Sequence, residues 1–276
     1  MSHFSVIVIG ENVKEQLAPY HEFECTGIDE HVQDIDITEE ARESWKESDE
    51  ESFVDHIQNY YGRSSVSFGE QPELTGAHKF GFALLNAQGE VQKVIKRTNP
   101  NATWDWYVQG GRWSNWIKDK NGEYRDQLRV SELGIELMQE EVAQKSAALY
   151  DRVHLIAGEP WEPWASVRAR LPLEQTRDFF HAQPAIKRLR ADKDFCWGIE
   201  DEWTTLSREQ YIEYRKEKVC IPYAWVEKGQ WHGKGEMGWF GASMNERPEK
   251  DYNKEFMDKL HSLSGDTLLT VIDCHI

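Results

Sequence analysis

Short apolar runs lie close to both ends of the chain and predict two buried strands. One run covers residues 5–9 and ends at Gly10, and the other covers residues 268–272. Side chains of a strand alternate between its two faces, and in both runs apolar residues occupy both sets of positions. Each strand is therefore expected to be covered on both faces. We predict that residues 4–9 and 268–273 are adjacent antiparallel strands of one sheet.

The segments next to these runs predict an α+β fold. Residues 11–18 have apolar side chains at helical spacing, and so do residues 250–263. Residues 223–227 and 237–242 flank a glycine-rich turn, which is typical of a hairpin. Together with the terminal strands, the order is β-α-β-β-α-β, which is the ferredoxin-like order.

This order divides the chain into a terminal core and an insertion. Residues 1–20 and 222–276 are expected to form the ferredoxin-like antiparallel sheet core, and residues 21–221 a large inserted α+β region that carries the Trp-rich motif. The expected elements of the insertion are helices opened by capping boxes at Ser48–Glu51 and Ser207–Gln210, a hairpin of residues 80–85 and 91–96, and a helix over residues 131–150.

Charge and apolar content narrow the class of partner. The 276 residues carry a formal net charge of −17, which repels a nucleic-acid duplex unless basic residues gather locally. Such a surface either attracts basic partners or serves solubility alone. The first apolar run, residues 4–9, is too short for a signal or membrane segment. We therefore expect a cytoplasmic protein that binds neither duplex nucleic acid nor a membrane.

The cysteines support a reducing compartment. There are four, none of them in a C-x-x-C pair, and their wide spacing is ordinary for reduced cytosolic thiols. We predict that no two of them are bridged; they are Cys25, Cys196, Cys220 and Cys274.

Residues 104–116 are the segment richest in groups that carry chemistry. They hold four of the 12 tryptophans of the chain, a carboxylate, an arginine and a glycine pair. The glycine pair permits positive φ and close backbone approach, Arg112 is suited to grip a phosphate or carboxylate, and indole faces stack on planar rings. The expected ligand- or partner-binding residues are Trp104, Asp105, Trp106, Tyr107, Gly110, Gly111, Arg112 and Trp113. A purely structural alternative stays open, in which the glycine pair is a turn in an aromatic core and Asp105 pairs with Arg112.

The predicted sheet also brings two histidines together. If the first and last strands are neighbours, His3 and His275 lie close to each other at one edge, near Asp273 and Cys274. Such a group is able to bind a metal or to shuttle protons. Histidines near chain ends are more often without function, so we assign no metal site and name His3 and His275 only as the candidates.

The remaining motifs argue against common enzyme classes. Residues 233–238 fit the pattern G-x-G-x-x-G, but a dinucleotide loop needs a helix after it, and here a second strand follows. The chain has no G-x-S-x-G elbow, Walker loop, H-E-x-x-H helix or D-x-D-x-D-G loop. We therefore assign no cofactor, and the missing motifs favour a protein that is not an enzyme.

Three segments carry a resemblance to a family. The opening MSHFSVIVIG, the central WDWY with GGRW, and the closing TLLTVIDCHI resemble a family of uncharacterised proteins of tailed bacteriophages and prophages. The likeness covers both ends and a central block. It implies a viral accessory protein that acts in the cytoplasm of a bacterial host, and it carries no catalytic assignment.

Two functions are compatible with these observations. The first is an accessory protein that binds a host bacterial protein, such as a component of anti-phage defence, and inhibits or redirects it, because Trp and Arg dominate interface energetics. The second is an enzyme or sponge for a nucleotide-like small molecule. In that case Asp105 is the acid or base, Arg112 the phosphate clamp, and the neighbouring tryptophans the stacking cage. A concave pocket holding Trp104 and Arg112 favours the second function, and an exposed patch favours the first.

Overall fold

The chain folds into two units. The computed structural model describes residues 2–22, 30–60, 67–68, 81–196, 198–238 and 242–276. Unit 1 contains residues 1–113, 222–247 and 268–276, and unit 2 contains residues 114–221 and 248–267.

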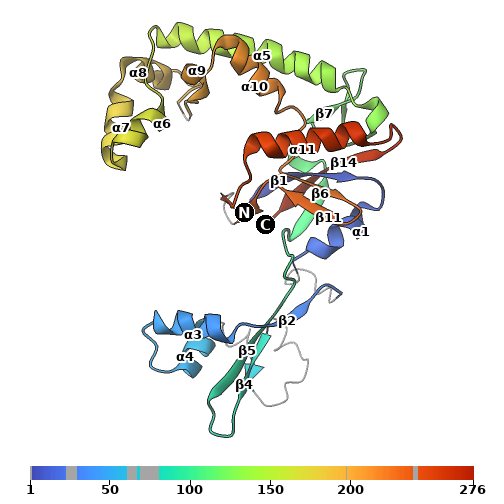
Figure 1. Ribbon diagram of the computed structural model, residues 1–276, viewed down its shortest axis with the longest axis vertical. Helices are drawn as coiled ribbons and strands as arrows, with labels where there is room; N and C mark the ends of the chain where they lie inside the picture. Colours follow the sequence, from blue (N-terminus) through green and yellow to red (C-terminus); the bar gives the residue numbers. More distant parts are fainter. Residues whose placement is uncertain (1, 23–29, 61–66, 69–80, 197, 239–241) are drawn as a thin grey trace. The chain divides into compact units, whose positions relative to one another are not determined.

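Both ends of the chain form the centre of one sheet in unit 1. Strand β1 (His3–Ile9) pairs antiparallel with β14 (Leu268–His275), from His3 opposite His275 to Ile9 opposite Leu269. Figure 1 shows the two chain ends side by side at this pair. The prediction that the terminal runs are antiparallel neighbours is confirmed, and so is the α+β class.

The sheet extends on both sides of this central pair. Strand β10 (Ala224–Glu227) runs parallel to β1 and forms a hairpin with β11 (Gln230–Gly233), while β6 (Trp106–Gln109) pairs antiparallel with β14. The order in unit 1 is therefore β11-β10-β1-β14-β6. Because β10 enters parallel to β1, the sheet is mixed and not wholly antiparallel. The hairpin partner of β10 is thus β11, the strand directly after it, and not the predicted strand over residues 237–242. Strand β12 (Glu236–Met237), at the start of that predicted segment, pairs instead with β13 (Ser243–Met244).

Burial on both faces of β1 explains its continuous apolar sequence. Phe4, Val6 and Val8 belong to one apolar cluster, together with Leu17 from the short helix α1 (Val13–Leu17). The helix runs directly into the 3-10 turn η1 (Ala18–Tyr20), which contains Pro19. On the other face, Ile7 and Ile9 are also buried. Both faces of the strand are therefore buried.

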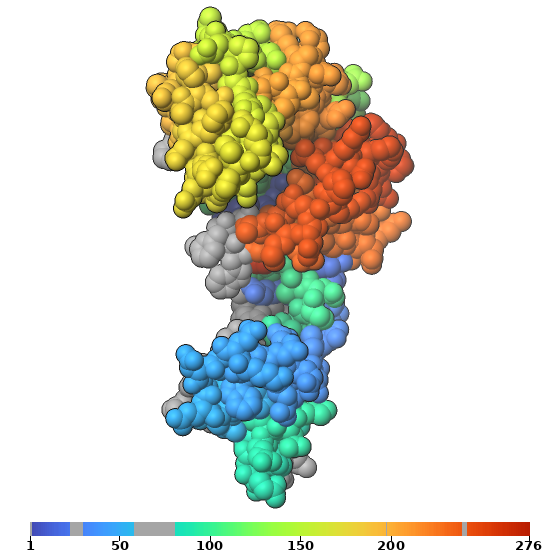
Figure 2. All heavy atoms as spheres, turned by 60° about the vertical axis from the view of Figure 1, so that its left-hand side comes forward, coloured from blue at the N-terminus to red at the C-terminus, as the bar shows by residue number. Residues whose placement is uncertain are grey.

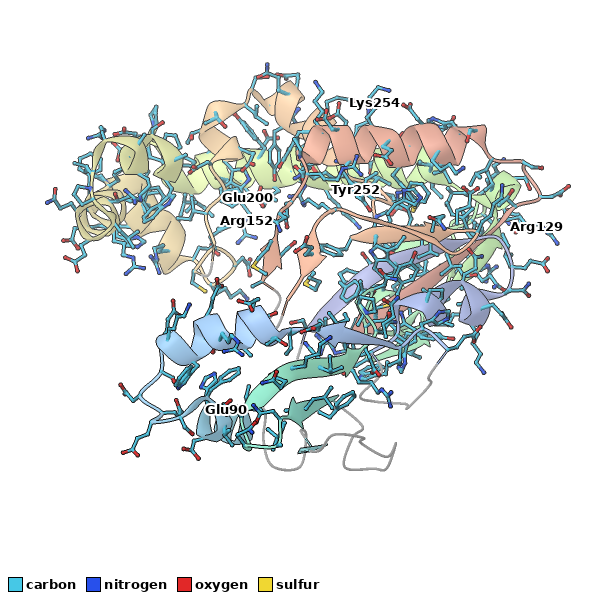
Figure 3. All side chains as sticks on the ribbon, turned by 60° about the horizontal axis from the view of Figure 1, so that its bottom comes forward. Glu90, Arg129, Arg152, Glu200, Tyr252 and Lys254 are labelled. Carbon is cyan, nitrogen blue, oxygen red and sulfur yellow. The ribbon has the colours of Figure 1, made fainter. Side chains whose placement is uncertain are left out.

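Residues 30–98 contribute a second sheet with two helices. Its strand order is β2 (Gln33–Asp36), β5 (Val91–Thr98), β4 (Gly81–Leu85) and β3 (Ser67–Phe68), and helices α3 (Thr38–Lys46) and α4 (Phe53–Tyr60) accompany it. Figure 2 shows the blue surface of these helices beside the green β4–β5 hairpin. The predicted hairpin is confirmed; Glu90, labelled in Figure 3, lies at its turn, where Asn86 Nδ2 donates to its carboxylate at 2.8 Å.

The start of α4 differs from the prediction. Ser52 Oγ accepts the backbone N–H of Asp55 at 3.1 Å and donates to its carboxylate at 2.6 Å, so Ser52 caps the helix. Ser48 instead closes the preceding helix, with its N–H and hydroxyl donating to Trp45 O. The helix cap therefore lies four residues after the predicted one. Ser48 and Ser52 lie in the same acidic stretch, and the sequence alone does not distinguish which of them caps the helix.

Unit 2 is largely helical. The long helix α5 (Ile135–Ala157) packs with α10 (Arg208–Lys216) and α8 (Pro184–Ala191) around buried Val153, Leu189 and Tyr211. Ser207 caps α10 as predicted, with Gln210 completing the box. Arg152, labelled in Figure 3, lies on α5 and forms ion pairs with Asp192 and Asp194. The remaining elements are β7 (Ile117–Lys118), β8 (Tyr124–Arg125), β9 (Gln127–Arg129), η4 (Val130–Glu132), α6 (Trp164–Arg170), α7 (Leu173–Ala182), α9 (Glu202–Thr205) and α11 (Glu249–Ser262).

The two units differ from the predicted division of the chain. The Trp-rich segment, up to Trp113, lies with the terminal sheet, whereas α11 lies with the helices of unit 2. No helix among the described residues is long and apolar enough to cross a membrane. Cys196, Cys220 and Cys274 are free thiols, and Cys25 lies outside the described residues.

Candidate functional site

The three segments singled out in the sequence meet on one face of the terminal sheet. The register of β1, β14 and β6 places His3, His275 and Trp106 in one row across the strands. The next row on this face contains Asp273, between Ser5 and Val108. Side chains in neighbouring rows of one sheet face are within contact distance. The pairing of strands therefore gathers two histidines, a carboxylate and an indole that are far apart in sequence.

His3 forms the first of two histidine–carboxylate pairs. Its Nδ1 lies 3.0 Å from Oδ1 of Asp273, whose side chain is 2% exposed. The other oxygen, Oδ2, accepts the backbone N–H of Arg112 at 3.0 Å. An ionised carboxylate only accepts hydrogen bonds, so the ring nitrogen of His3 donates. Both oxygens of Asp273 are thus occupied, and the carboxylate is held between β1 and the turn that follows β6.

The glycine pair is needed to bring that turn onto Asp273. Gly110 and Gly111 have φ of +71° and +54°, and the latter opens the 3-10 turn η3 (Gly111–Trp113). A Cβ atom at Gly111 would lie 2.5 Å from Oδ2 of Asp273 and 2.7 Å from Val108 Cγ1. Both the backbone conformation and the space exclude a larger residue here. The Gly-Gly-Arg sequence therefore serves to present a backbone N–H to a buried carboxylate.

His275 forms the second pair. Its Nδ1 lies 2.7 Å from Oδ1 of Asp105, which also accepts the backbone N–H of Trp106 at 2.7 Å. The His275 ring, whose side chain is 3% exposed, stacks on the Trp106 indole with centroids 4.8 Å apart and meets the His3 ring edge to face at 4.9 Å. We call the four residues His3, Asp105, Asp273 and His275 the His–Asp cluster.

The predicted site residues are distributed over three environments. Trp104 is buried on the opposite face, where its Nε1 donates to Leu17 O at 3.2 Å and its ring lies 4.3 Å from that of His21. Tyr107 is partly buried on that same face, and burial raises the pKa of its hydroxyl. Trp113 is partly buried in η3. Trp104 therefore belongs to the core and is not available to stack on a ligand.

The exposed groups of the segment lie together on β6 and its following turn. Trp106 and Val108 are each 44% exposed, and Arg112 is exposed as well. Among the described residues, no carboxylate forms an ion pair with Arg112. The structural alternative in which Asp105 pairs with Arg112 is wrong, because Asp105 binds His275 instead. We call Trp106, Val108 and Arg112 the β6 surface.

Among the described residues of unit 1, β6 is also the last strand of the sheet on its side. The Gly110 N–H donates to Val271 O, and in an antiparallel ladder the inward bonds recur at every second residue. Val108 therefore faces β14 with its backbone groups, while the N–H and C=O of Tyr107 and Gln109 point away from it. No hydrogen bond to these outward groups is found among the described residues. A short open strand edge thus lies beside the exposed Trp106 and Val108 side chains.

Metal ligation, access to a cavity and a reactive thiol are the features that would point to chemistry at the cluster. Among the described residues, no group of three or more His, Cys, Asp or Glu side chains is placed to hold a metal ion. Four cavities in the described part of the chain have volumes of about 210–710 Å³, and none of them is lined by His3, Asp105, Trp106, Arg112 or His275. Cys274, which lies between Asp273 and His275 in sequence, is buried. Burial raises the pKa of its thiol, so the thiol stays protonated and inert.

Sequence reasoning found most of these residues but not their roles. It named His3, His275, Asp105 and Arg112, and it expected the two histidines to be neighbours. It missed that residues 106–109 form a strand, because WYVQ is too short and too weakly alternating to signal one. It also missed Val108, which no motif distinguishes and whose exposure follows only from pairing with Asp273.

Comparisons with known proteins supply no further assignment. No family model, no curated protein and no solved structure matches the chain.

Proposed function

We propose that this protein is a binding protein, which attaches to a segment of a host bacterial protein through the β6 surface and so inhibits or redirects it. The observation that carries the proposal is an open strand edge with two exposed apolar side chains, Trp106 and Val108. The resemblance to phage and prophage proteins is the reason to place the partner in the cytoplasm of a bacterial host.

The composition of the surface supports protein binding. Trp and Arg are the residues enriched among those that dominate binding energy, and here one of each flanks a valine on the same short segment. Burial of apolar surface contributes about 25 cal/mol per Å². An indole that is 44% exposed offers a large part of its area to a partner. Arg112 adds a charged fork that suits a carboxylate on the partner.

The His–Asp cluster supports the proposal by holding this surface in place. Asp105 fixes the start of β6 through His275, and Asp273 fixes the turn after it through the Arg112 N–H. Stacking on His275 restrains the Trp106 ring. A surface held in one conformation before binding loses less conformational entropy on association. On this view the two histidine–carboxylate pairs are positioning groups and not an active site.

The mode of attachment follows from the strand edge. An extended segment of the partner adds next to β6 and bonds to the outward N–H and C=O groups of Tyr107 and Gln109, while alternate side chains contact Trp106 and Val108. The nucleotide-directed enzyme has weaker support at this place, because Trp104 is buried, Asp105 is engaged, and no described cavity adjoins Arg112.

Three variants test the proposal by capture from lysate of infected or prophage-bearing cells. Trp106→Ala removes the main apolar contact. Gln109→Pro removes one outward N–H, and proline is tolerated at such an edge position. Leu155→Ala is the matched control, since Leu155 is apolar and 81% exposed on helix α5. We expect one host protein to be retained by wild type and Leu155→Ala, and retention to fall at least tenfold with the other two.

Controls separate binding from folding. Thermal melts check that Gln109→Pro unfolds within about 2 °C of wild type, whereas Val108→Pro, which removes an inward bond to β14, is expected to melt much lower. A photo-crosslinking residue at position 109 then identifies the contacted segment. Retention of the same proteins by all variants, or crosslinks from position 155 and none from 109, would refute the β6 surface as the binding site.

A further inference from the structure

A cavity of about 710 Å³ lies in unit 1 on the sheet face opposite the His–Asp cluster. Its walls come from the start of β1, the turn η1, the loop before β6, strands β11 and β12 with the residues between them, and the residues after β13. The residues that give it its chemical character are Phe4, Tyr20, Tyr223, Trp231, Lys234 and Arg247. None of them belongs to the β6 surface, so this is a separate site.

Aromatic rings form one side of the cavity. The rings of Tyr20 and Trp231 lie 5.1 Å apart, and Phe4 meets Trp231 and Tyr223 edge to face. Hydrogen bonds hold Tyr20 and Trp231 in place. The Tyr20 hydroxyl donates to Gly229 O and accepts the backbone N–H of Trp231, both at 2.9 Å. Apart from buried Phe4, these rings remain partly exposed to the cavity side. Rings fixed in this way offer flat apolar surface without a large entropic loss on binding.

Two cations are held next to these rings by the backbone. The Lys234 N–H donates to Tyr223 O, and the Arg247 N–H donates to Lys234 O, both at 2.8 Å. Lys234 and Arg247 therefore start from adjacent points of the same wall. Two carboxylates are near: Glu236 lines the cavity and accepts from Asn245, and Glu246 lies 3.5 Å from the Lys234 ammonium. The charged groups that line the cavity itself are two cations and one anion.

Glycine makes this wall compact. A Cβ atom on Gly235 would lie 2.7 Å from Met244 O and 2.8 Å from Ser243 Oγ, and one on Gly233 would lie 3.1 Å from the Trp231 indole nitrogen. The Gly-Lys-Gly sequence thus brings Lys234 close to β13 and to the aromatic side. Residues 233–235 connect two strands, as expected from the sequence, and their glycines allow the chain to pack closely beside the cavity.

We infer that this cavity binds a small nucleotide, a planar ring that carries a phosphate. Its volume lies within the range of small-molecule sites. The rings provide stacking surface for a base, and Lys234 and Arg247 provide the charge that a phosphate requires. A free nucleotide is favoured over a nucleic-acid strand, because the protein's net charge of −17 opposes a long polyanion but not a compact one next to two cations.

Isothermal titration with AMP and GMP tests the inference on the full chain. We expect at least one of them to bind with Kd below about 1 mM and the matching nucleoside at least tenfold more weakly. Lys234→Gln and Arg247→Gln should each weaken nucleotide binding about tenfold, while Arg168→Gln, an exposed arginine on α6 in unit 2, should leave it unchanged.

Two results would overturn this site. One is the absence of binding for both nucleotides at millimolar concentration. The other is a diffuse charge effect without base recognition, which would appear as equal weakening by Arg168→Gln or as displacement by inorganic phosphate as effective as displacement by the nucleotide. Trp231→Leu adds a check that does not alter charge: it should weaken AMP and GMP but not phosphate. The β6 surface lies on the other face of the sheet. The test of partner capture with the Trp106 and Gln109 variants is therefore independent of whether this cavity binds a nucleotide.

Discussion

Replacement of Gly111 by alanine is the most direct test of how the central motif is built. The new Cβ would lie 2.5 Å from Oδ2 and 2.6 Å from Cβ of Asp273, and it would sit on a backbone with φ of +54°. Asp273 cannot retreat, because its other oxygen is bonded to His3 and its strand pairs on both sides. The turn must therefore move away and lose the bond from the Arg112 N–H to the carboxylate.

The expected cost has two separable parts. Left-handed backbone costs an L-residue about 1–2 kcal/mol. Loss of a hydrogen bond to a charged group costs about 1.5–3 kcal/mol. Gly229→Ala carries only the first part, since Gly229 has φ of +72° and no atom within 4 Å of its built Cβ. We therefore expect Gly111→Ala to destabilise unit 1 by about 2.5–5 kcal/mol and Gly229→Ala by about 1–2 kcal/mol.

Urea unfolding and amide hydrogen exchange together measure the difference. Exchange at Arg112 should be protected in wild type and Gly229→Ala and fast in Gly111→Ala, because its N–H is the group that loses its acceptor. Amides of α5 in unit 2 provide an internal reference that neither variant should move. Equal destabilisation by the two variants, with Arg112 still protected, would refute the conclusion that the glycine pair exists to serve Asp273.

Three further outcomes follow from the same contacts. Arg112→Ala should change stability by less than about 0.5 kcal/mol in urea unfolding, as is usual for an exposed side chain without an ion pair, yet reduce partner capture; a large loss of stability would show a structural role. Asp105→Asn should lower stability by about 1–1.5 kcal/mol, because asparagine offers His275 a neutral acceptor in place of a charged one, and an unchanged melt would contradict the importance of that charge. Burial raises the pKa of Cys220 from 9.0 to about 12, so its neutral thiol favours the folded state and this contribution is fully present below pH 9. Stability should then fall by up to about 1.4 kcal/mol per pH unit between pH 9 and 12, and a Cys220→Ala variant, compared at each pH, should lack this part of the slope.

The terminal sheet was predictable because its strongest signals are local. Residues 5–9 and 268–272 are apolar on both faces, and that pattern has few solutions other than a buried strand pair. The arrangement of the hairpin was not predictable in the same way. Whether β10 or its partner lies next to β1 depends on tertiary packing, and a short glycine-rich stretch offers two adjacent turns, one after β10 and one after β11.

The candidate site was predictable as a set of residues and not as an arrangement. Asp105 was weighed as a partner of Arg112 from their proximity in sequence, but the ladder places His275 beside it. Trp104 and Trp106 are two residues apart, a spacing that would put them on one strand face. A β-bridge from Trp104 to His21 places it before β6 begins and turns it into the core. Sequence spacing cannot reveal such a break in the strand.

The exposure of Trp106 is difficult to explain by folding alone. An exposed indole on an open strand edge invites aggregation, and proteins usually limit such edges. This chain limits the risk with a strand of only four residues flanked by Asp105 and Arg112, but it does not bury the ring. At the same time it uses two partly buried histidine–carboxylate pairs to hold that strand and its turn in place. Rigid support beneath an exposed apolar side chain has no evident benefit for the protein alone. Binding of a partner that covers Trp106 and Val108 would be strengthened both by the exposed side chains and by the rigid support beneath them.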